Sequence, residues 1–108
     1  MSQITTHILD AALGGPARGV AVALQRGDGS EIAADVTDDA GRIAELGPER
    51  LEAGTYRLTF AVGDYFNRTD RETFYPVVSI DFSVADGDQH YHVPLLISPF
   101  AYSTYRGN

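Results

Sequence analysis

The chain of 108 residues contains no cysteine and no lysine. Without thiols, a disulfide framework and thiolate catalysis are both excluded. All eight cations are arginines, whose planar guanidinium can make paired hydrogen bonds to an oxygen-rich group. No apolar run approaches the ~20 residues that a helix needs to cross a bilayer. We therefore expect no membrane partner, and any inward-pointing arginine becomes a candidate contact for an anionic or planar polar ligand.

The acidic character of the chain limits its partners further. Its formal net charge is −7, whereas binding to nucleic acid requires a basic stripe on the surface. The first seven residues lack the basic region and the apolar stretch of a secretory signal, so we expect a cytoplasmic location. The length and the apolar fraction of 44% fit a single globular domain spanning residues 1–108.

Short segments in which apolar and polar residues alternate recur along the chain, and turns rich in glycine, aspartate and proline separate them. This alternation predicts strands, at residues 4–10, 20–25, 31–36, 42–44, 55–62, 77–84 and 90–97. A short helix is expected at residues 64–69, with Asp64 capping its N-terminus. Seven or eight short strands at this spacing predict an all-β protein, an antiparallel β-sandwich.

The same alternation places two histidines away from the predicted core. His7 lies on the opposite face of its strand from Ile4 and Ile8. His92 likewise shares an outward face with Pro94. A single outward histidine is most often a solvated surface residue. Here the outward face is partly apolar, which suggests that another subunit covers it.

Two further features are ambiguous when they are taken alone. Arg42 follows a turn and begins a predicted edge strand, where a charge commonly protects the edge from pairing. The segment from Tyr105 to Asn108 carries a phenol and a guanidinium, but chain ends are usually frayed. Catalysis would require several of these side chains to converge in space.

Five segments, taken in order, resemble the transthyretin-related 5-hydroxyisourate hydrolases, and together they extend over essentially the whole chain. They are Thr-Thr-His-Ile-Leu-Asp at 5–10, Thr-Asp-Asp-Ala-Gly-Arg at 37–42, Gly-Thr-Tyr at 54–56, His-Tyr-His-Val-Pro-Leu-Leu-Ile-Ser-Pro at 90–99 and Tyr-Ser-Thr-Tyr-Arg-Gly at 102–107. The family ends in Tyr-Arg-Gly-Ser, and true transthyretins lack this tetrad and both matching histidines. Asn108 departs from the family's serine but keeps a small polar side chain at that position.

The resemblance implies a transthyretin-like (prealbumin-like) sandwich of two four-stranded sheets with one short helix. It also implies a homotetramer, a dimer of dimers, with the sites in a channel at the dimer–dimer interface. The implied reaction is hydrolysis of the cyclic amide of 5-hydroxyisourate in urate degradation, with no metal and no cofactor. By position, the implied catalytic residues are His7, Arg42 and His92, and the implied substrate-binding residues are Tyr105, Arg106, Gly107 and Asn108.

The residue types suit this chemistry. A neutral histidine can take a proton from water near pH 7 and return it as imidazolium. Arg42 stays charged and can stabilise an oxyanion. Which of His7 and His92 starts as the base is left open. Three alternatives also remain: a zinc site formed by His7, His90 and His92, a small-molecule carrier without catalysis, and a purely structural domain.

Overall fold

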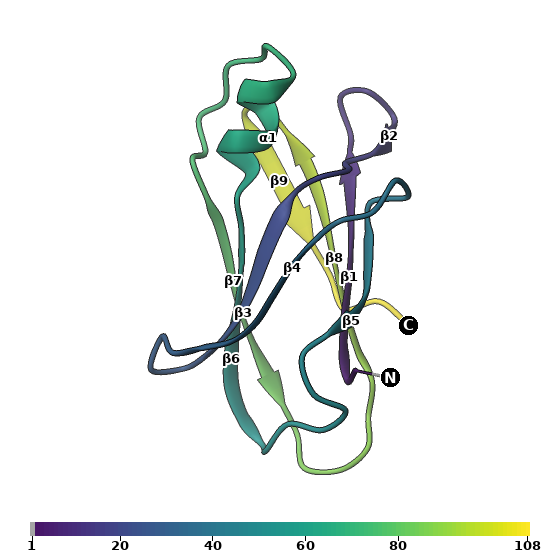
Figure 1. Cartoon of the computed structure of the whole chain (residues 1–108), viewed down its shortest axis with the longest axis vertical. Coiled ribbons are helices and arrows are strands. Elements are labelled where there is room, and N and C mark those ends of the chain that lie inside the picture. The colour runs from purple at the N-terminus through teal and green to yellow at the C-terminus, as the bar shows by residue number, and fades with distance from the viewer. Residues whose placement is uncertain (1) are drawn as a thin grey trace.

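The computed structural model describes residues 2–108, and in this part of the chain nine strands form two sheets that pack face to face (Figure 1). One sheet contains β2 (Gly15–Pro16), β1 (Ile4–Asp10), β8 (Tyr91–Ser98) and β9 (Ala101–Thr104) in that order, with β5 (Arg42–Leu46) also paired to β1. The other sheet has the order β4 (Glu31–Val36), β3 (Ala21–Arg26), β6 (Gly54–Phe60) and β7 (Val78–Val84). We call them the β1–β8 sheet and the β3–β6 sheet.

The core lies between the two sheets and follows the alternation in the sequence. In β1, every second residue from Ile4 to Asp10 is buried and the residues between them are half-buried. In β6, Leu58 and Phe60 are fully buried against this face. Burying each large apolar side chain contributes about 2 kcal/mol to folding. The outward positions of β1, including Thr5 and His7, are therefore held by the packing of their neighbours.

The predicted helix exists, but its start and its cap differ from the prediction. Helix α1 (Val62–Arg68) lies at one end of the sandwich (Figure 1), and its N-cap residue is Ala61 without a side-chain cap. Asp64 lies in the first turn, so the prediction that it caps the helix is wrong. An acidic residue in the first turn still interacts favourably with the helix dipole. Burial of Val62 draws the helix start towards the core.

Two details of the sandwich go beyond the expected pair of four-stranded antiparallel sheets. The β3–β6 sheet has four antiparallel strands, as expected. In the other sheet, β1 and β8 run parallel, and both β5 and the two-residue β2 pair with β1, giving five strands. The two parallel strands are far apart in sequence and are not joined by a hairpin, so no short turn imposes an antiparallel direction.

The chain's last segment is ordered. Strand β9 pairs antiparallel with β8, and Gly107 forms an isolated bridge with His92. Figure 1 shows the C-terminal end beside β5 and β1, and Asn108 shares a pocket with residues of both strands. The end of the tail, Gly107 and Asn108, thus lies on the outward face of the β1–β8 sheet.

A buried polar cluster ties the helix to this sheet. Asp10, at the end of β1, is fully buried and accepts hydrogen bonds from the Tyr65 hydroxyl at 2.8 Å and from the Arg71 guanidinium. Burial alone would raise the pKa of Asp10, but the hydrogen bonds from Arg71 and Tyr65 outweigh it and hold that pKa below its ordinary value.

Within residues 2–108, no helix is long and apolar enough to span a bilayer.

Candidate functional site

Strand register brings the candidate residues together on the outward face of the β1–β8 sheet. His7 lies directly opposite Arg42 in the β1–β5 pairing. On the other side of β1, Thr5 lies opposite His92 in the β1–β8 pairing. Side chains of directly opposed antiparallel residues stand about 5 Å apart on one face. Three neighbouring strands therefore present one imidazole, one guanidinium and a second imidazole side by side.

A turn that is closed by hydrogen bonds to the Asp38 side chain places Arg42 at the start of β5. The Asp38 carboxylate accepts hydrogen bonds from the backbone N–H groups of Ala40 and Arg42, each at 2.9 Å. Gly41 has a φ of 74°, and a Cβ there would lie 2.4 Å from the carbonyl oxygen of Ile8. Only glycine allows this close approach of the turn to β1. The turn thereby fixes where the Arg42 side chain leaves the sheet.

His7 is held against the same turn. Its Nε2 lies 3.0 Å from the carbonyl oxygen of Ala40. A carbonyl only accepts hydrogen bonds, so Nε2 of His7 is the donor and carries a proton. In a neutral His7 the free electron pair is therefore on Nδ1.

His92 is fixed from two sides. The Thr5 hydroxyl lies 2.8 Å from its Nδ1, and the backbone N–H of Gly107 donates to its carbonyl oxygen at 2.8 Å. Gly107 also lies against the imidazole, because a Cβ at this position would be only 2.5 Å from Cδ2 of His92. The tail therefore packs directly on the ring.

A shallow pocket of about 230 Å³ lies on this outward face, beside His92. It is lined by Thr5, Thr6, Arg42, Ile43, Ala44, His90, His92 and Asn108. Burial, followed by the nearby charges of Arg42, His7 and His90, lowers the pKa of His92 from its usual 6.5. At neutral pH the His92 imidazole is therefore uncharged and able to accept a proton.

The tail residues divide between two places. Asn108 lines the His92 pocket, and Gly107 packs on the His92 ring. Tyr105 and Arg106 line a separate hollow of about 300 Å³, together with residues of β7 and β8. The Arg106 guanidinium stacks 4.5 Å from the centre of the Tyr91 ring. Within one chain neither residue lines the His92 pocket, and their predicted substrate contact stays a prediction.

Arg106 braces the tail where it leaves the sheet. Its Nη2 donates to the side-chain oxygen of Gln89 at 3.1 Å and to the backbone oxygen of His90 at 3.3 Å. A guanidinium over an aromatic ring adds roughly 0.5–1 kcal/mol at an exposed site. This brace leads the chain from β9 towards Gly107 and Asn108.

Thr5 is a site residue that sequence reasoning missed, and His90 was considered only as a metal ligand. Alternation places Thr5 on the face of His7. Its meeting with His92 depends on the β1–β8 register, which no local pattern specifies. For His90, the alternation along the predicted strand at residues 90–97 indicates that it shares a face with His92.

The three-histidine zinc alternative is not supported by the ligand geometry. In residues 2–108, no three histidine, cysteine or carboxylate side chains gather as a potential metal site. His7 donates to a backbone carbonyl, whereas His90 and His92 both point at the Thr5 hydroxyl. His7 is thus engaged with a carbonyl in the turn before β5, while His90 and His92 share the Thr5 hydroxyl.

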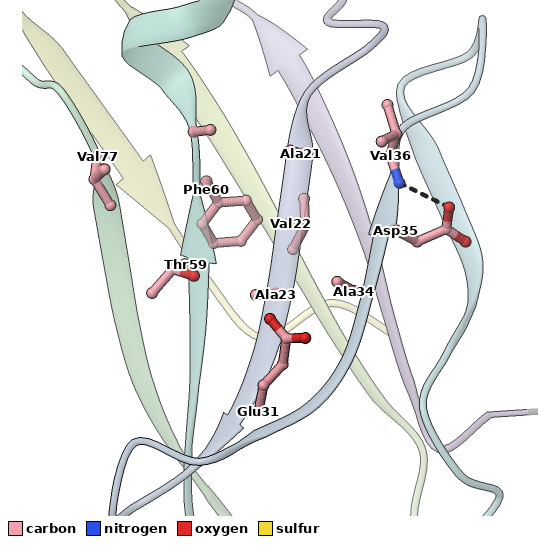
Figure 2. A pocket seen from close by; sticks show the side chains of 11 residues that line it. Ala21, Val22, Ala23, Glu31, Ala34, Asp35, Val36, Thr59, Phe60 and Val77 are labelled. Carbon is pink, nitrogen blue, oxygen red and sulfur yellow. Dashed lines mark hydrogen bonds between the residues drawn. The ribbon is translucent and has the colours of Figure 1, made fainter.

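A larger hollow, of about 580 Å³, lies on the outer face of the β3–β6 sheet (Figure 2). Its floor consists of small and apolar side chains such as Ala23 and Ala34, and its ionisable groups are Glu31 and Asp35. It contains neither a histidine nor an arginine. Its size therefore does not make it the better candidate for acid–base chemistry.

Comparison with known proteins identifies the family. The model of the HIUase/Transthyretin family matches residues 4–107, which include every strand and both site histidines. The chain belongs to this family. A 5-hydroxyisourate hydrolase of Caulobacter vibrioides is 50% identical over 115 residues, covering 100% of both chains.

Solved structures of this family have the same fold. The 5-hydroxyisourate hydrolase of Klebsiella pneumoniae superposes with a TM-score of 0.90 at 45% identity, over 97% of this chain and 98% of that one. Sea bream transthyretin in complex with thyroxine superposes with a TM-score of 0.91 at 35% identity, over 97% and 94% of the two chains. The predicted transthyretin-like sandwich is confirmed. Because the fold is shared by a 5-hydroxyisourate hydrolase and by a transthyretin in complex with thyroxine, function has to be argued from the site.

Proposed function

We propose that this protein is a 5-hydroxyisourate hydrolase, which opens the cyclic amide of 5-hydroxyisourate during urate degradation. The product is 2-oxo-4-hydroxy-4-carboxy-5-ureidoimidazoline. The observation that carries the proposal is the pocket in which His92, Arg42 and Asn108 meet beside His7. Relatives at 40–50% identity that bear the hydrolase name support it.

His92 acts as the general base in this proposal. Its lowered pKa keeps the imidazole neutral at pH 7, and it lines the pocket. His7 is less suited to start the reaction, because it is not among the residues that line the pocket. His92 takes a proton from a water molecule, and the resulting hydroxide attacks the amide carbon of the substrate.

Arg42 stabilises the charge that develops during this attack. As the hydroxide adds, negative charge moves onto the carbonyl oxygen, and a permanently charged guanidinium at the pocket edge favours that state. The C–N bond of the ring then breaks. The leaving nitrogen takes the proton that His92 gained from water, either directly from the His92 imidazolium or relayed through His7, which returns the site to its starting state.

We also propose that the enzyme is a homotetramer, a dimer of dimers, with each site closed by a neighbouring copy. The pocket is shallow and lies on an open sheet face. Half-buried Leu9 and Leu96 lie on this same outward face, and apolar surface of this kind favours coverage by protein. A cytoplasmic location stays a prediction.

The competing function is that of a small-molecule carrier, in line with the thyroxine complex of sea bream transthyretin. An apolar ligand is best held in an aliphatic channel, whereas the pocket described here is lined by two histidines and an arginine. Polar heterocycles fit this lining better. A carrier without catalysis would not accelerate the decay of 5-hydroxyisourate, so the two functions can be distinguished by experiment.

The deciding experiment is the decay of freshly prepared 5-hydroxyisourate, followed by ultraviolet absorbance with and without the protein. Hydrolysis predicts faster decay in proportion to protein concentration. A decay rate equal to that of buffer would overturn the enzyme proposal and favour a carrier. Analytical ultracentrifugation of the same sample tests the tetramer, and a monomer at assay concentration would contradict it.

A further inference from the structure

The Thr5 hydroxyl links two imidazoles. Its Oγ1 lies 2.8 Å from Nδ1 of His92 and 2.9 Å from Nε2 of His90. A hydroxyl has one proton to donate and two electron pairs to accept with. Thr5 can therefore donate to one ring only, and a hydrogen bond with the other ring requires that ring's N–H to be the donor.

This constraint couples the tautomers of the two histidines. If Thr5 donates to His90, then Nδ1 of His92 carries the proton and its Nε2 holds the free electron pair. If Thr5 donates to His92, then Nε2 of His92 carries the proton and cannot act as a base. The tautomer matters because the lowered pKa of His92 leaves its imidazole neutral near pH 7. A neutral imidazole carries only one N–H, so only the other nitrogen can accept a proton.

We infer that Thr5 and His90 are positioning residues that hold His92 in the Nδ1–H tautomer, leaving Nε2 as the proton acceptor of the site. The catalytic part of this inference rests on the proposed hydrolase function. In an imidazole the two nitrogens point in different directions, so with Nδ1 directed at Thr5 the Nε2 atom is directed away from it. His92 itself lines the pocket, which is where an acceptor is needed.

The backbone supports the same arrangement. Thr5 and His92 are register partners in the parallel β1–β8 pairing, so their side chains leave the sheet on one face. The carbonyl of His90 accepts from Arg106, and this contact anchors the residue just before β8 begins. The three linked side chains therefore come from two segments that the sheet holds together.

The test uses Thr5→Val, which removes the hydroxyl but keeps the branched shape that a strand favours, and Thr5→Ser, which keeps the hydroxyl. Thr55→Val makes the same chemical change at an exposed strand position of the other sheet and serves as the control. We expect Thr5→Val to lower kcat by about tenfold or more with KM changed less than about twofold. Thr5→Ser should restore most of the loss, and Thr55→Val should have no effect.

A spectroscopic readout separates this role from a merely structural one. Nitrogen-15 chemical shifts of histidine distinguish the Nδ1–H and Nε2–H tautomers in the intact protein. We expect Nδ1–H for His92 in the parent and in Thr5→Ser, and a mixture or Nε2–H in Thr5→Val. His90→Leu should also shift His92 towards Nε2–H, because Thr5 is then free to donate to it; this variant keeps the test available if Thr5→Val fails to fold.

An Nε2–H tautomer of His92 in the parent protein would overturn the inference, and so would unchanged kcat and tautomer in Thr5→Val. The two proposals fail in different ways. If the parent does not accelerate decay of 5-hydroxyisourate, the hydrolase proposal and the catalytic role of Thr5 both fall. If the parent is active and Thr5→Val matches it, only the positioning role is wrong.

Discussion

Gly107 packs so closely on His92 that a methyl group in place of its α-hydrogen would come within 2.5 Å of the imidazole Cδ2. The same glycine donates its backbone N–H to the His92 carbonyl at 2.8 Å. The chain's penultimate residue thus sets both the backbone and the ring of the proposed base. A small residue at this position is a requirement of the site and not of the core.

Replacing Gly107 by alanine is therefore expected to displace the His92 ring and lower kcat by about tenfold to a hundredfold, because misplacement of a catalytic group by about 1 Å has that effect. Thermal stability should change little, since Gly107 lies outside the core. Gly15→Ala is the matched control, because nothing lies within 4 Å of the added methyl group. Steady-state kinetics and calorimetry measure the two quantities; full activity in Gly107→Ala would show that the ring tolerates the shift.

Removal of either imidazole should reduce turnover. His92→Ala and His7→Ala are each expected to lower kcat by about a hundredfold or more, which is the usual contribution of general acid–base catalysis. Gln25→Ala, on the outer side of the other sheet, should retain the parent rate and serves as the control. Near-normal turnover in both histidine variants would contradict the mechanism.

The pH dependence follows from the direction of the His92 pKa shift. Burial and the charges of Arg42, His7 and His90 lower this pKa, so the neutral base persists below pH 6.5. We expect kcat/KM to fall on the acid side with a midpoint below 6.5. In Arg42→Gln one cationic neighbour is lost, so the pKa of His92 rises and the midpoint moves to higher pH, alongside a lower rate. A pH–rate profile of each protein checks this, and an unmoved midpoint would argue against His92 as the base.

The buried pair of Asp10 and Arg71 should matter for stability. Arg71→Met leaves the Asp10 carboxylate buried without its charged partner, and breaking such a pair costs about 3 kcal/mol of the free energy of unfolding. The exposed pair of Arg57 and Asp81 provides the control: Arg57→Met should cost much less, because solvent screens this pair. Urea denaturation at pH 7 measures both, and equal losses would contradict the burial argument.

The stabilisation by this pair also has a defined pH window. The folded-state pKa of Asp10 lies below its ordinary value of 3.8, so the stabilisation is fully present above that value. It is lost as the pH falls through the lower, folded-state pKa, where the carboxylate becomes protonated. The difference in stability between the parent and Arg71→Met should therefore shrink below about pH 4.

The sequence by itself determined the class of fold and the outward direction of the site histidines. Both follow from alternation, which is a local property: Ile4 and Ile8 are drawn into the core, so His7 between them faces out. The family resemblance added Arg42 and the tail, and the structure places Arg42 opposite His7 as one register pair.

Only the tertiary structure decided which side chains touch. The contact of Thr5 with His92 depends on a parallel register between strands at opposite ends of the chain, and the contact of Gly107 with His92 depends on the path of the tail after β9. The tertiary structure also places Tyr105 and Arg106 in a different hollow from Asn108. Such contacts are set by long-range backbone hydrogen bonds and core packing, and a shift of one residue in register would reverse every side chain without changing the local pattern.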